Sequence, residues 1–261
     1  MHERSYTVHV TIAGNLASVA RHEWILGRLT DQGTVTIHDA AAALDVSEMT
    51  IRRDLLELEA NGMLRRTRGG AVALGPTGFA DRDRRGARAK ARVATKLLPL
   101  VPETGAIALD ASSTMLRLAR ALEGARDLTV LTNGLETFHA LSGKPGIRAI
   151  LTGGEIDPRT GSLVGPVAVR AAGTFLLTTA FVSAAAVHPA LGPSEAALED
   201  AEIKQVFAGC AAAVVLAADH SKLDRRSLTV GLQWSDVSTF VTDLDPDDAR
   251  LDSYRAQVAV S

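Results

Sequence analysis

Arginine and hydroxyl side chains gather in one short segment, residues 46–60, at a spacing that suits contact with DNA. Ser47 is a good helix N-cap, because its side-chain oxygen accepts from the free amides of the next turn. In the helix that follows, Ile51, Leu55 and Leu58 fall on one narrow face, which is predicted to pack. The other side is predicted to touch DNA and carries Met49, Thr50, Arg52 and Arg53.

A second short helix is predicted just upstream. Thr36, followed three residues later by Asp39, resembles a capping box, and the helix that it starts ends near Asp45. Two helices joined by a tight turn form a helix-turn-helix, in which the start of the second helix reads base edges. Arg52 and Arg53 are therefore the expected base contacts.

The segment that follows, Met63–Val72, predicts a basic hairpin beside this helix. Gly69 and Gly70 permit a tight turn between two strands. Arginines on such a hairpin bind phosphate most simply, and this contact positions a protein on the duplex without reading its sequence. For the segment TIRRDL, residues 50–55, the alternative is an ordinary amphipathic helix with a solvated charged face. The predicted DNA contacts are Ser47, Met49, Thr50, Arg52, Arg53, Arg65, Arg66 and Arg68.

Length and charge favour more than one domain. A chain of 261 residues with 46% hydrophobic residues suggests about two globular domains. Residues 1–92 hold 14 basic and 11 acidic residues, whereas the remainder holds 14 and 19. A basic front and an acidic rear fit a DNA-binding domain that carries a larger domain with another role. The single cysteine, Cys210, lies in an apolar run and is interpreted as a buried small hydrophobe.

Membrane and metal proteins are disfavoured. The apolar run over residues 211–218 is well short of the roughly 20 residues that a membrane span needs, and the N-terminus lacks the apolar core of a signal peptide. We therefore expect a cytoplasmic protein without membrane association. No Cys and His spacing suggests a metal site, and no cofactor is expected.

From residue 87 onward the pattern predicts a parallel sheet. A helix is expected from Ala87 to Leu98, and short apolar strands then alternate with helices. We predict an α/β chain in which an N-terminal winged helix-turn-helix precedes a Rossmann-like, mostly parallel α/β effector domain. Residues 1–17 are interpreted as a loose extension, 18–74 as the DNA-binding domain, 75–86 as a linker and 87–261 as the effector domain. The linker holds Arg82, Arg84 and Arg85, which could contact phosphate, but Asp81 and Asp83 offset their charge, so the favoured interpretation is a solvated hinge.

Polar residues follow successive predicted strands of the rear domain. In open parallel sheets ligands bind where strands end and helices begin, and hydroxyls with free backbone amides suit an anion such as phosphate. Each residue also has a simpler interpretation, as a helix cap or a turn former. Together they favour a pocket. The predicted effector-binding residues are Asp110, Ser112, Ser113, Thr114, Asn133, Gly153, Gly154 and Lys222.

These motifs resemble the DeoR family of bacterial transcription regulators. The similarity begins with R-x-x-x-I-L-x-x-L at residues 21–29, VS-x-x-TIRRDL-x-x-LE and G-x-L-x-R-x-x-GGA. It continues through LDASST, LTNG, LTGG, SLVGP, TAFV and DHSK, so that it covers residues 21–243. The resemblance implies an effector domain similar to sugar-phosphate isomerases, which binds phosphorylated sugars or polyols.

Two positions depart from the family pattern. Asp45 stands where the family commonly has glycine, and Asp tolerates a left-handed turn better than most residues. The segment 183–186 reads Ser, Ala, Ala, Ala where the family usually has a G-A-D-G-like turn. The usual acid, which accepts hydrogen bonds from sugar hydroxyls, is absent. This leaves open whether the effector differs, binds weakly or is absent.

We therefore predict a repressor of carbohydrate-metabolism genes that binds double-stranded operator DNA and is relieved by a phosphorylated sugar or polyol. One recognition helix buries little surface, so a homo-oligomer, a dimer or higher, is expected. One alternative is a sugar-phosphate isomerase with Asp110 or Glu195 as base. Another is a DNA-binding activator without an effector. No catalytic residue is assigned, and the sequence does not identify the effector or the regulated genes.

Overall fold

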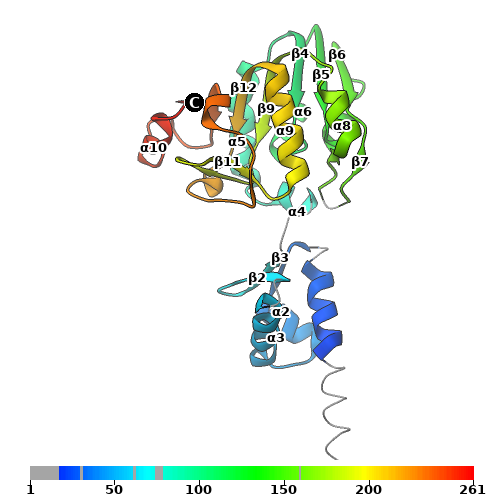
Figure 1. Ribbon diagram of the computed structural model, residues 1–261, viewed down its shortest axis with the longest axis vertical. Coiled ribbons are helices and arrows are strands. Elements are labelled where there is room, and N and C mark those ends of the chain that lie inside the picture. Colours follow the sequence, from blue (N-terminus) through cyan, green and yellow to red (C-terminus); the bar gives the residue numbers. More distant parts are fainter. Residues whose placement is uncertain (1–17, 30–31, 61–62, 74–78, 159) are drawn as a thin grey trace, which may run out of the picture. The chain divides into compact units, whose positions relative to one another are not determined.

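The computed structural model describes residues 18–29, 32–60, 63–73, 79–158 and 160–261 (Figure 1). The expected extension over residues 1–17 lies outside the described residues. The chain divides into two compact units, Met1–Asp81 and Arg82–Ser261. No helix in the described ranges has the length and apolar character that a membrane crossing requires.

The first unit is a winged helix-turn-helix. Its strands form a small antiparallel sheet in the order β1-β3-β2, in which β3 pairs with both neighbours. Its core is closed by Ile25, Ile51, Leu55 and Leu58, each at most 1% exposed. The elements are a helix over residues 18–29, β1 (Thr34–Thr36), α2 (Ile37–Leu44), α3 (Glu48–Ala60), β2 (Leu64–Thr67) and β3 (Gly70–Ala73).

The turn between α2 and α3 forms as the residue types predict. The backbone amide of Asp39 donates to Thr36 Oγ1 at 3.0 Å, so that Thr36 caps α2. Asp45 ends α2 with φ 51° and ψ 47°, the left-handed conformation that the family's glycine adopts freely. The expectation that Asp45 tolerates this turn is confirmed.

The hairpin has a different turn from the expected one. Thr67 pairs with Gly70, so the turn residues are Arg68 and Gly69, and Gly70 is the first residue of β3. A Cβ built on Gly70 would lie 1.9 Å from the carbonyl oxygen of Val35. The missing side chain of Gly70 therefore permits β3 to approach β1, and the turn itself does not depend on it.

The second unit is built on a parallel sheet. Seven strands of its described part lie in the order β15-β14-β12-β9-β4-β5-β6, and every neighbouring pair is parallel. The strands are β4 (Thr104–Leu109), β5 (Asp127–Thr132), β6 (Ile147–Leu151), β9 (Leu177–Ser183), β12 (Ala211–Ala217), β14 (Thr239–Val241) and β15 (Ala259–Val260).

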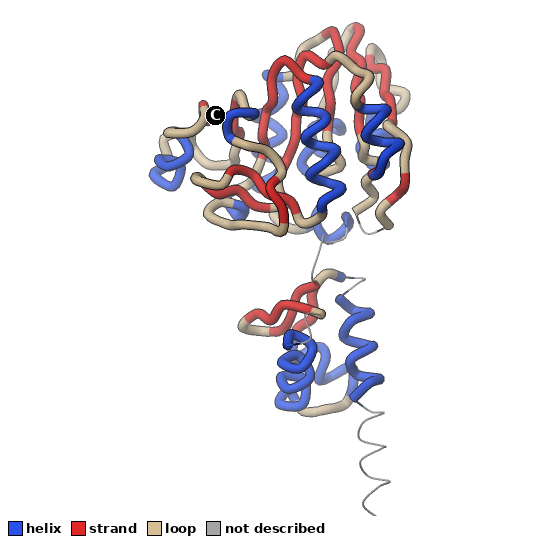
Figure 2. The backbone as a smooth tube through the Cα atoms, viewed as in Figure 1, coloured by secondary structure: helices blue, strands red, loops and turns tan. Residues whose placement is uncertain are grey.

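Helices cover both faces of this sheet, as βαβ connections require. Along β12, Val214 and Leu216 face one cluster of buried residues, whereas Val215 and Ala217 face the other. Figures 1 and 2 show α8 and α9 in front of the strands, and these helices belong to the first cluster. The second cluster contains α5, α6 and α7. The helices are α5 (Ala87–Leu97), α6 (Ser113–Ala121), α7 (Leu135–Leu141), α8 (Gly165–Ala172) and α9 (Leu198–Cys210).

Two antiparallel additions were not predicted. One is a pair, β7 and β8, and the other is a sheet in the order β10-β11-β13. Their strands are too short for a periodic pattern to reveal them. They are β7 (Glu155–Ile156), β8 (Leu163–Val164), β10 (Ala186–His188), β11 (Gly192–Glu195) and β13 (Thr229–Val230).

Three aromatic rings from residues 234–254 pack together in the first of the two buried clusters. Trp234, Phe240 and Tyr254 lie with ring centroids 5.8–6.0 Å apart. Tyr254 is fully buried, and its hydroxyl donates to the carbonyl of Val187 at 3.1 Å. Buried aromatic pairs contribute beyond their area, so this cluster fixes the C-terminal strand against the core.

The segment between the units is more ordered than expected. It contains a helix, α4 (Phe79–Arg84), and the boundary between the units falls within it. The interpretation of Arg82 as a solvated residue is wrong, because the residue is partly buried and its guanidinium donates to the carbonyls of Thr160 and Ala111. By contrast, Arg84 and Arg85 are exposed. Alternating charges in this segment gave no indication that one arginine of the three is partly buried and bound to the second unit.

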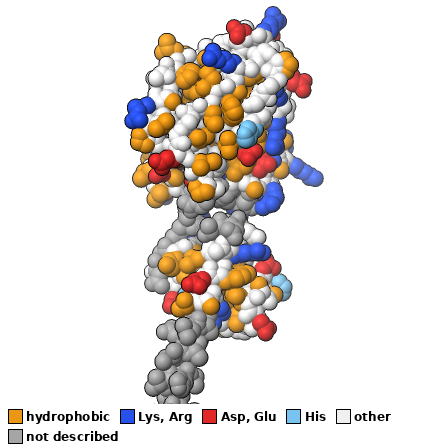
Figure 3. All heavy atoms as spheres, turned by 90° about the vertical axis from the view of Figure 1, so that its right-hand side faces the viewer, with side chains coloured by type: hydrophobic (Ala, Val, Ile, Leu, Met, Phe, Trp, Pro, Cys, Tyr) orange, Lys and Arg blue, Asp and Glu red, His pale blue; other side chains and the backbone are white. Residues whose placement is uncertain are grey.

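Figure 3 shows the face of the molecule that lies on the right in Figure 1, where α8 and β7 are found. Hydrophobic side chains are scattered over this face of the second unit, and several of the charged ones lie toward its edges. Val167 of α8 and Ile156 of β7 are 54% and 52% exposed.

Cys210, expected to be buried, is only partly buried at the end of α9, where it packs against the core.

Candidate functional site

Helix α3 presents a polar surface supported by an apolar back. Ser47 caps the helix: its Oγ accepts from the Thr50 amide at 3.2 Å and lies 2.9 Å from Thr50 Oγ1. Met49 is 64% exposed, and Arg53 is exposed as well. Arg52 also reaches solvent, but its guanidinium donates to Glu48 one turn earlier at 2.8 Å. Of the two predicted base contacts, Arg53 is the one with no ion pair among the described residues.

A buried acid fixes the back of this helix and was missed from the sequence. Asp54 is 3% exposed and receives two hydrogen bonds from Arg21, at 2.7 and 2.9 Å, together with one contact from His22 at 3.3 Å. A bidentate arginine pair fixes orientation as well as distance. Asp54 thus ties α3 to the helix over residues 18–29. The signal was available, because Asp54 is a charged residue on the same face as Ile51 and Leu58.

The hairpin places the three predicted arginines on its surface. Arg65, Arg66 and Arg68 are exposed, whereas Leu64 is buried. Arg66 is held by Glu59 of α3, which accepts from the Arg66 amide and from its Nε, both at 2.8 Å. The two hydrogen bonds lower the pKa of Glu59. This contact fixes the hairpin against the recognition helix.

In the second unit the carboxyl end of β4 holds a buried charge network. The carboxylate of Asp110 is fully buried and accepts from the Ser112 amide, and from the amide and hydroxyl of Ser183. Lys204 Nζ lies 3.2 Å from Asp110 Oδ2 and 2.7 Å from Glu195 Oε1. One lysine therefore joins carboxylates from β4 and β11.

Burial and pairing act in opposite directions on these groups. Burial raises the pKa of Glu195 to about 7 even though Lys204 lowers it. Burial would also raise the pKa of Asp110, but Lys204 and the hydrogen bonds from Ser112 and Ser183 bring it below its ordinary value. Burial would lower the pKa of Lys204, and the two carboxylates outweigh this and raise it. Asp110 and Lys204 are thus charged at neutral pH.

The turn after β9, where the family's acid is replaced by Ala185, lies next to this network. The Ser183 carbonyl accepts from Lys204 Nζ at 2.9 Å, and the Ala185 amide donates to Ser194 of β11 at 3.1 Å. Asp110, Glu195 and Lys204 therefore supply charge at this edge of the sheet without the acid of the family pattern.

A group of cations lies beside the start of α6. Lys90 of α5 is buried, and its Nζ donates to Ser113 Oγ at 2.9 Å. Burial, the largest cause, together with the like charges of Lys222, Arg117 and Arg82, lowers the pKa of Lys90 to about 8, although Asp219 acts in the opposite direction. The pKa of Lys222 is also lowered by burial. Positive charges held close together beside a helix N-terminus are suited to bind an anion.

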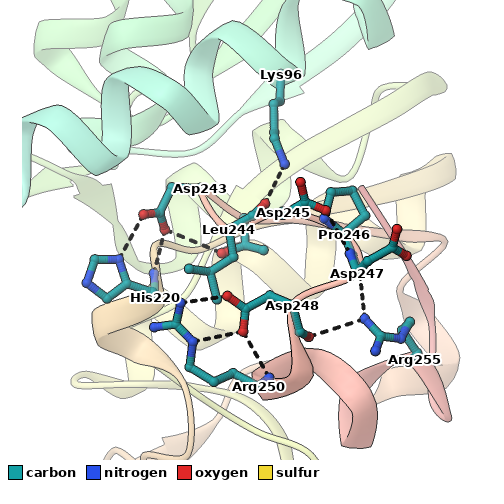
Figure 4. Close-up of polar contacts among 11 residues, drawn as sticks. Lys96, His220, Asp243, Leu244, Asp245, Pro246, Asp247, Asp248, Arg250 and Arg255 are labelled. Atoms are coloured by element: carbon teal, nitrogen blue, oxygen red, sulfur yellow. Dashed lines mark hydrogen bonds and ion pairs between the residues drawn. The ribbon is translucent and has the colours of Figure 1, made fainter.

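Lys222 is positioned by a short turn that is bound to a neighbouring loop. The turn is η2 (His220–Lys222), and Asp219 caps it by accepting from the Ser221 amide at 3.0 Å. Figure 4 shows the His220 ring facing Asp243, with Nδ1 2.8 Å from the carboxylate. The same view shows Lys96 of α5 donating to the carbonyl of Leu244 at 2.7 Å. The loop after β14 thus holds both α5, which carries Lys90, and the turn that carries Lys222.

The remaining predicted residues divide into two groups. Ser112 caps α6, and Ser113 and Thr114 are buried in its first turn, so they lie with Asp110 at one strand end. Asn133 is buried and donates to the Leu163 carbonyl at 3.2 Å, while its Oδ1 has no hydrogen-bond partner among the described residues.

The two glycines after β6 have different surroundings. Gly153 and Gly154 adopt φ values of 71° and 112°. A Cβ on Gly154 would lie 2.6 Å from the Val164 carbonyl oxygen, so close packing accounts for this glycine. A Cβ on Gly153 would meet nothing within 4 Å. Among the residues that the structure describes, no hydrogen bond joins either glycine to Asp110 or Lys222.

Three basic residues of this region were missed from the sequence. Lys90 shares a helical face with Val93, Ala94 and Leu97, and Lys204 shares one with Ala201 and Phe207. A lysine in the middle of an apolar face is a readable signal for a buried partner. Arg82 carried no such signal. Within the described ranges, no three His, Cys, Asp or Glu residues are placed to hold a metal ion.

Comparison with known proteins agrees with this geometry. The model of the DeoR-like helix-turn-helix domain matches residues 21–77, and that of the DeoR C-terminal sensor domain matches residues 85–244. The chain is 33% identical to the HTH-type transcriptional regulator GolR of Listeria innocua, over 85% of this chain and 89% of that protein.

Two further relatives are repressors by name. The lactose phosphotransferase system repressor of Lactococcus lactis is 33% identical, over 85% of this chain and 90% of that protein. The glycerol-3-phosphate regulon repressor of Escherichia coli is 28% identical, over 87% of this chain and 91% of that protein. The relatives are transcription regulators and not enzymes. With a helix-turn-helix, a sensor domain and these relatives, the chain belongs to the DeoR family of transcriptional regulators.

Proposed function

We propose that this protein represses genes of carbohydrate metabolism and that a phosphorylated sugar or polyol relieves the repression. The observation that carries the proposal is the pair of lysines beside the start of α6: Lys90 is buried and donates to Ser113, and Lys222 is partly buried and lies close enough to lower the pKa of Lys90. Such a site favours a phosphate, whose charge offsets the repulsion among the cations. The names of the lactose and glycerol-3-phosphate relatives support this effector class.

Within this proposal the predicted residues have separate roles. Arg53 reads a base edge with Thr50 and Met49 beside it, whereas Arg65, Arg66 and Arg68 bind phosphates of the operator. In the sensor domain, Ser113 and Thr114 bind the phosphoryl group from the first turn of α6, and Lys222 binds it from η2. Asp110 holds the end of β9 by accepting hydrogen bonds from Ser183. Asn133 and Gly153 line the part of the pocket that receives the sugar.

The protein is further proposed to bind DNA as a homodimer or a higher oligomer. A single recognition helix contacts few bases, and two copies would match repeated half-sites one helical turn or a multiple apart. Light scattering of the purified chain tests this proposal. A monomer at the concentration that shifts operator DNA would contradict it.

A thermal-shift screen tests the effector class. A ligand that binds only the folded state raises the free energy of unfolding, by about 2.7 kcal/mol when its concentration is a hundred times its Kd. The melting temperature rises with it. The screen would compare glycerol 3-phosphate, ribose 5-phosphate and fructose 6-phosphate with the unphosphorylated compounds and inorganic phosphate. The proposal requires selective stabilisation by at least one phosphorylated compound.

The Lys222→Ala variant tests the location of the site. It should weaken binding of the active compound while operator binding in its absence stays unchanged. Lys144→Ala is the matched control, because Lys144 donates to the carbonyls of Arg120 and Leu122 and its loss changes the net charge equally. A normal response by Lys222→Ala would remove Lys222 from the site.

A further inference from the structure

Arg82 is the first residue of the sensor unit. Its contacts hold the segment that follows the DNA-binding unit against the sensor unit. The Arg82 Nη2 donates to the carbonyl of Thr160 at 2.9 Å and to that of Ala111 at 3.4 Å. Its guanidinium lies in the field of four carboxylates, those of Asp200, Asp110, Glu195 and Asp157. A charged side chain in this position ties the start of the sensor unit to the strand end that carries Asp110.

The backbone of the same residue occupies donors of the proposed phosphate site. The Arg82 carbonyl accepts from Ser113 Oγ at 3.2 Å and also from Lys90 Nζ. The next residue adds a clamp, since Arg117 donates to the Asp83 carboxylate and, at 2.8 Å, to the Asp83 carbonyl. We name these contacts of Arg82 and Asp83 the Arg82 anchor.

A phosphoryl group would compete for the same donors. Lys90 Nζ and Ser113 Oγ now donate to a neutral carbonyl, whereas a phosphoryl oxygen carries negative charge and would attract the lysine ammonium in addition to accepting its hydrogen bond. Lys222 and Arg117 act on Lys90 as like charges, and Asp219 offsets them in part. An anion that takes Lys90 and Ser113 therefore removes two of the contacts that hold the Arg82 carbonyl.

From this overlap, and resting on the proposed function of the site, we propose that a phosphorylated effector and the Arg82 anchor compete for Lys90 and Ser113. Effector binding then releases the segment that joins the two units. In the absence of the effector the anchor fixes this segment, and operator binding uses that fixed state. Arg82 is a positioning residue in this scheme and not an effector ligand.

Competition of this kind predicts two changes of opposite sign in one variant. Arg82→Ala removes the donors to Thr160 and Ala111, so the released state becomes more populated before any effector is added. The effector should bind more tightly, because less of its binding energy is used to displace the anchor. The affinity for the operator in the absence of effector should fall. Both changes arise from the same shift in the conformational equilibrium, and a shift of this kind typically changes an affinity by a factor of about 5 to 150.

The experiment uses the full chain, a duplex selected from a random pool for tight binding to the wild type, and the phosphorylated compound that stabilises it in the thermal-shift screen. Titrations would give Kd values for compound and duplex with wild type, Arg82→Ala and Arg84→Ala. Arg84 is the matched control, since it is the same residue type in the same helix and is exposed. Arg84→Ala should behave as wild type in the compound titration.

Hydrogen exchange gives a second readout that does not depend on a variant. The amides of residues 82–84 should exchange faster when the compound is added to wild type, and inorganic phosphate at high concentration should act in the same direction. In Asp83→Ala, which loses part of the anchor, these amides should exchange faster before any addition.

The outcomes separate this inference from the function on which it rests. If no phosphorylated compound binds wild type, the proposed function fails and the anchor fails with it. If a compound binds but Arg82→Ala binds it equally or more weakly, the proposed function stands and the competition is refuted. Loss of affinity for both compound and duplex would show that Arg82 has only a structural role, and would also refute it.

Discussion

The two sites of this protein hold their charges in different ways. In the winged helix, Arg52 is 48% exposed and its partner Glu48 lies one turn away on the same helix. In the sensor domain, Lys204 is 10% exposed, and its partners Asp110 and Glu195 come from separate strands. Surface charges are arranged by local spacing, whereas buried charges require that distant segments be brought together. Removing a charge from the first site should therefore change the free energy of unfolding little, whereas removing one from the second should lower it strongly.

The largest expected effect is in the buried network. Lys204→Met leaves the Asp110 and Glu195 carboxylates without their shared cation and should reduce the free energy of unfolding by about 3 to 5 kcal/mol. Urea denaturation would measure this loss. Lys144→Met is the control, with an expected change of less than about 1 kcal/mol. If both variants lose the same small amount, the contrast between the two sites is wrong.

A smaller effect is expected at the recognition helix. Arg53→Ala should cost about 1 to 3 kcal/mol on the cognate duplex and relax the sequence preference, if Arg53 makes a bidentate base contact. Arg66→Ala should weaken cognate and random duplexes by the same factor, because a phosphate contact does not read sequence. Fluorescence anisotropy with both duplexes measures this. Equal losses on the two duplexes for both variants would contradict the division of roles.

The pH dependence of effector binding sharpens the comparison further. The pKa of Lys90 is lowered to about 8, and the groups acting on it are Lys222, Asp219, Arg117 and Arg82. A bound anion favours the protonated lysine, so affinity is fully present below pH 8 and falls above it. The fall should be up to tenfold per pH unit, about 1.4 kcal/mol.

Calorimetry between pH 7 and 9 would show this fall, and the effector's phosphate charge is constant over the range because its second pKa is about 6. Lys90→Arg keeps the positive charge at every pH and should flatten the profile. DNA binding by the surface arginines should be unaffected, since arginine does not titrate here. A profile that is flat in wild type would show that Lys90 does not face the ligand.

The smallest effect is expected in the salt dependence of operator binding. Arg65→Ala removes one phosphate contact and should reduce the slope of log K against log salt by about 1. Arg66 shares its charge with Glu59, so the corresponding variant should reduce the slope by less. If Arg65→Ala leaves the slope unchanged, the hairpin does not lie on the phosphate backbone.

The sequence predicted what depends on local patterns. The cap at Thr36, the buried face of Ile51, Leu55 and Leu58, and the alternation of strands and helices after residue 87 all follow from spacing. These features involve residues within a few turns of one another. The left-handed turn at Asp45 was predicted on another ground, because the DeoR family commonly has glycine at this position and Asp tolerates the conformation.

The network of the sensor site could be predicted only in part. Asp110 and Ser113 were found because they follow a strand, but their partners Lys204 and Lys90 come from helices distant in sequence. Arg82 was misread, since nothing in a run of alternating charges distinguishes the arginine that a folded domain encloses. Tertiary structure alone decides which of several similar charges is buried.

The close approach at Gly70 has a consequence for how this domain can change. Gly70 directly follows the turn of the hairpin, and the Gly69 carbonyl within the turn accepts from the Ile37 amide at 2.8 Å. The backbone of the turn is therefore held against β1 and the start of α2, and inserted residues would disturb these contacts. The exposed side chains of Arg65 and Arg68 are free of this constraint. The charge of the hairpin can thus evolve while its backbone position is kept.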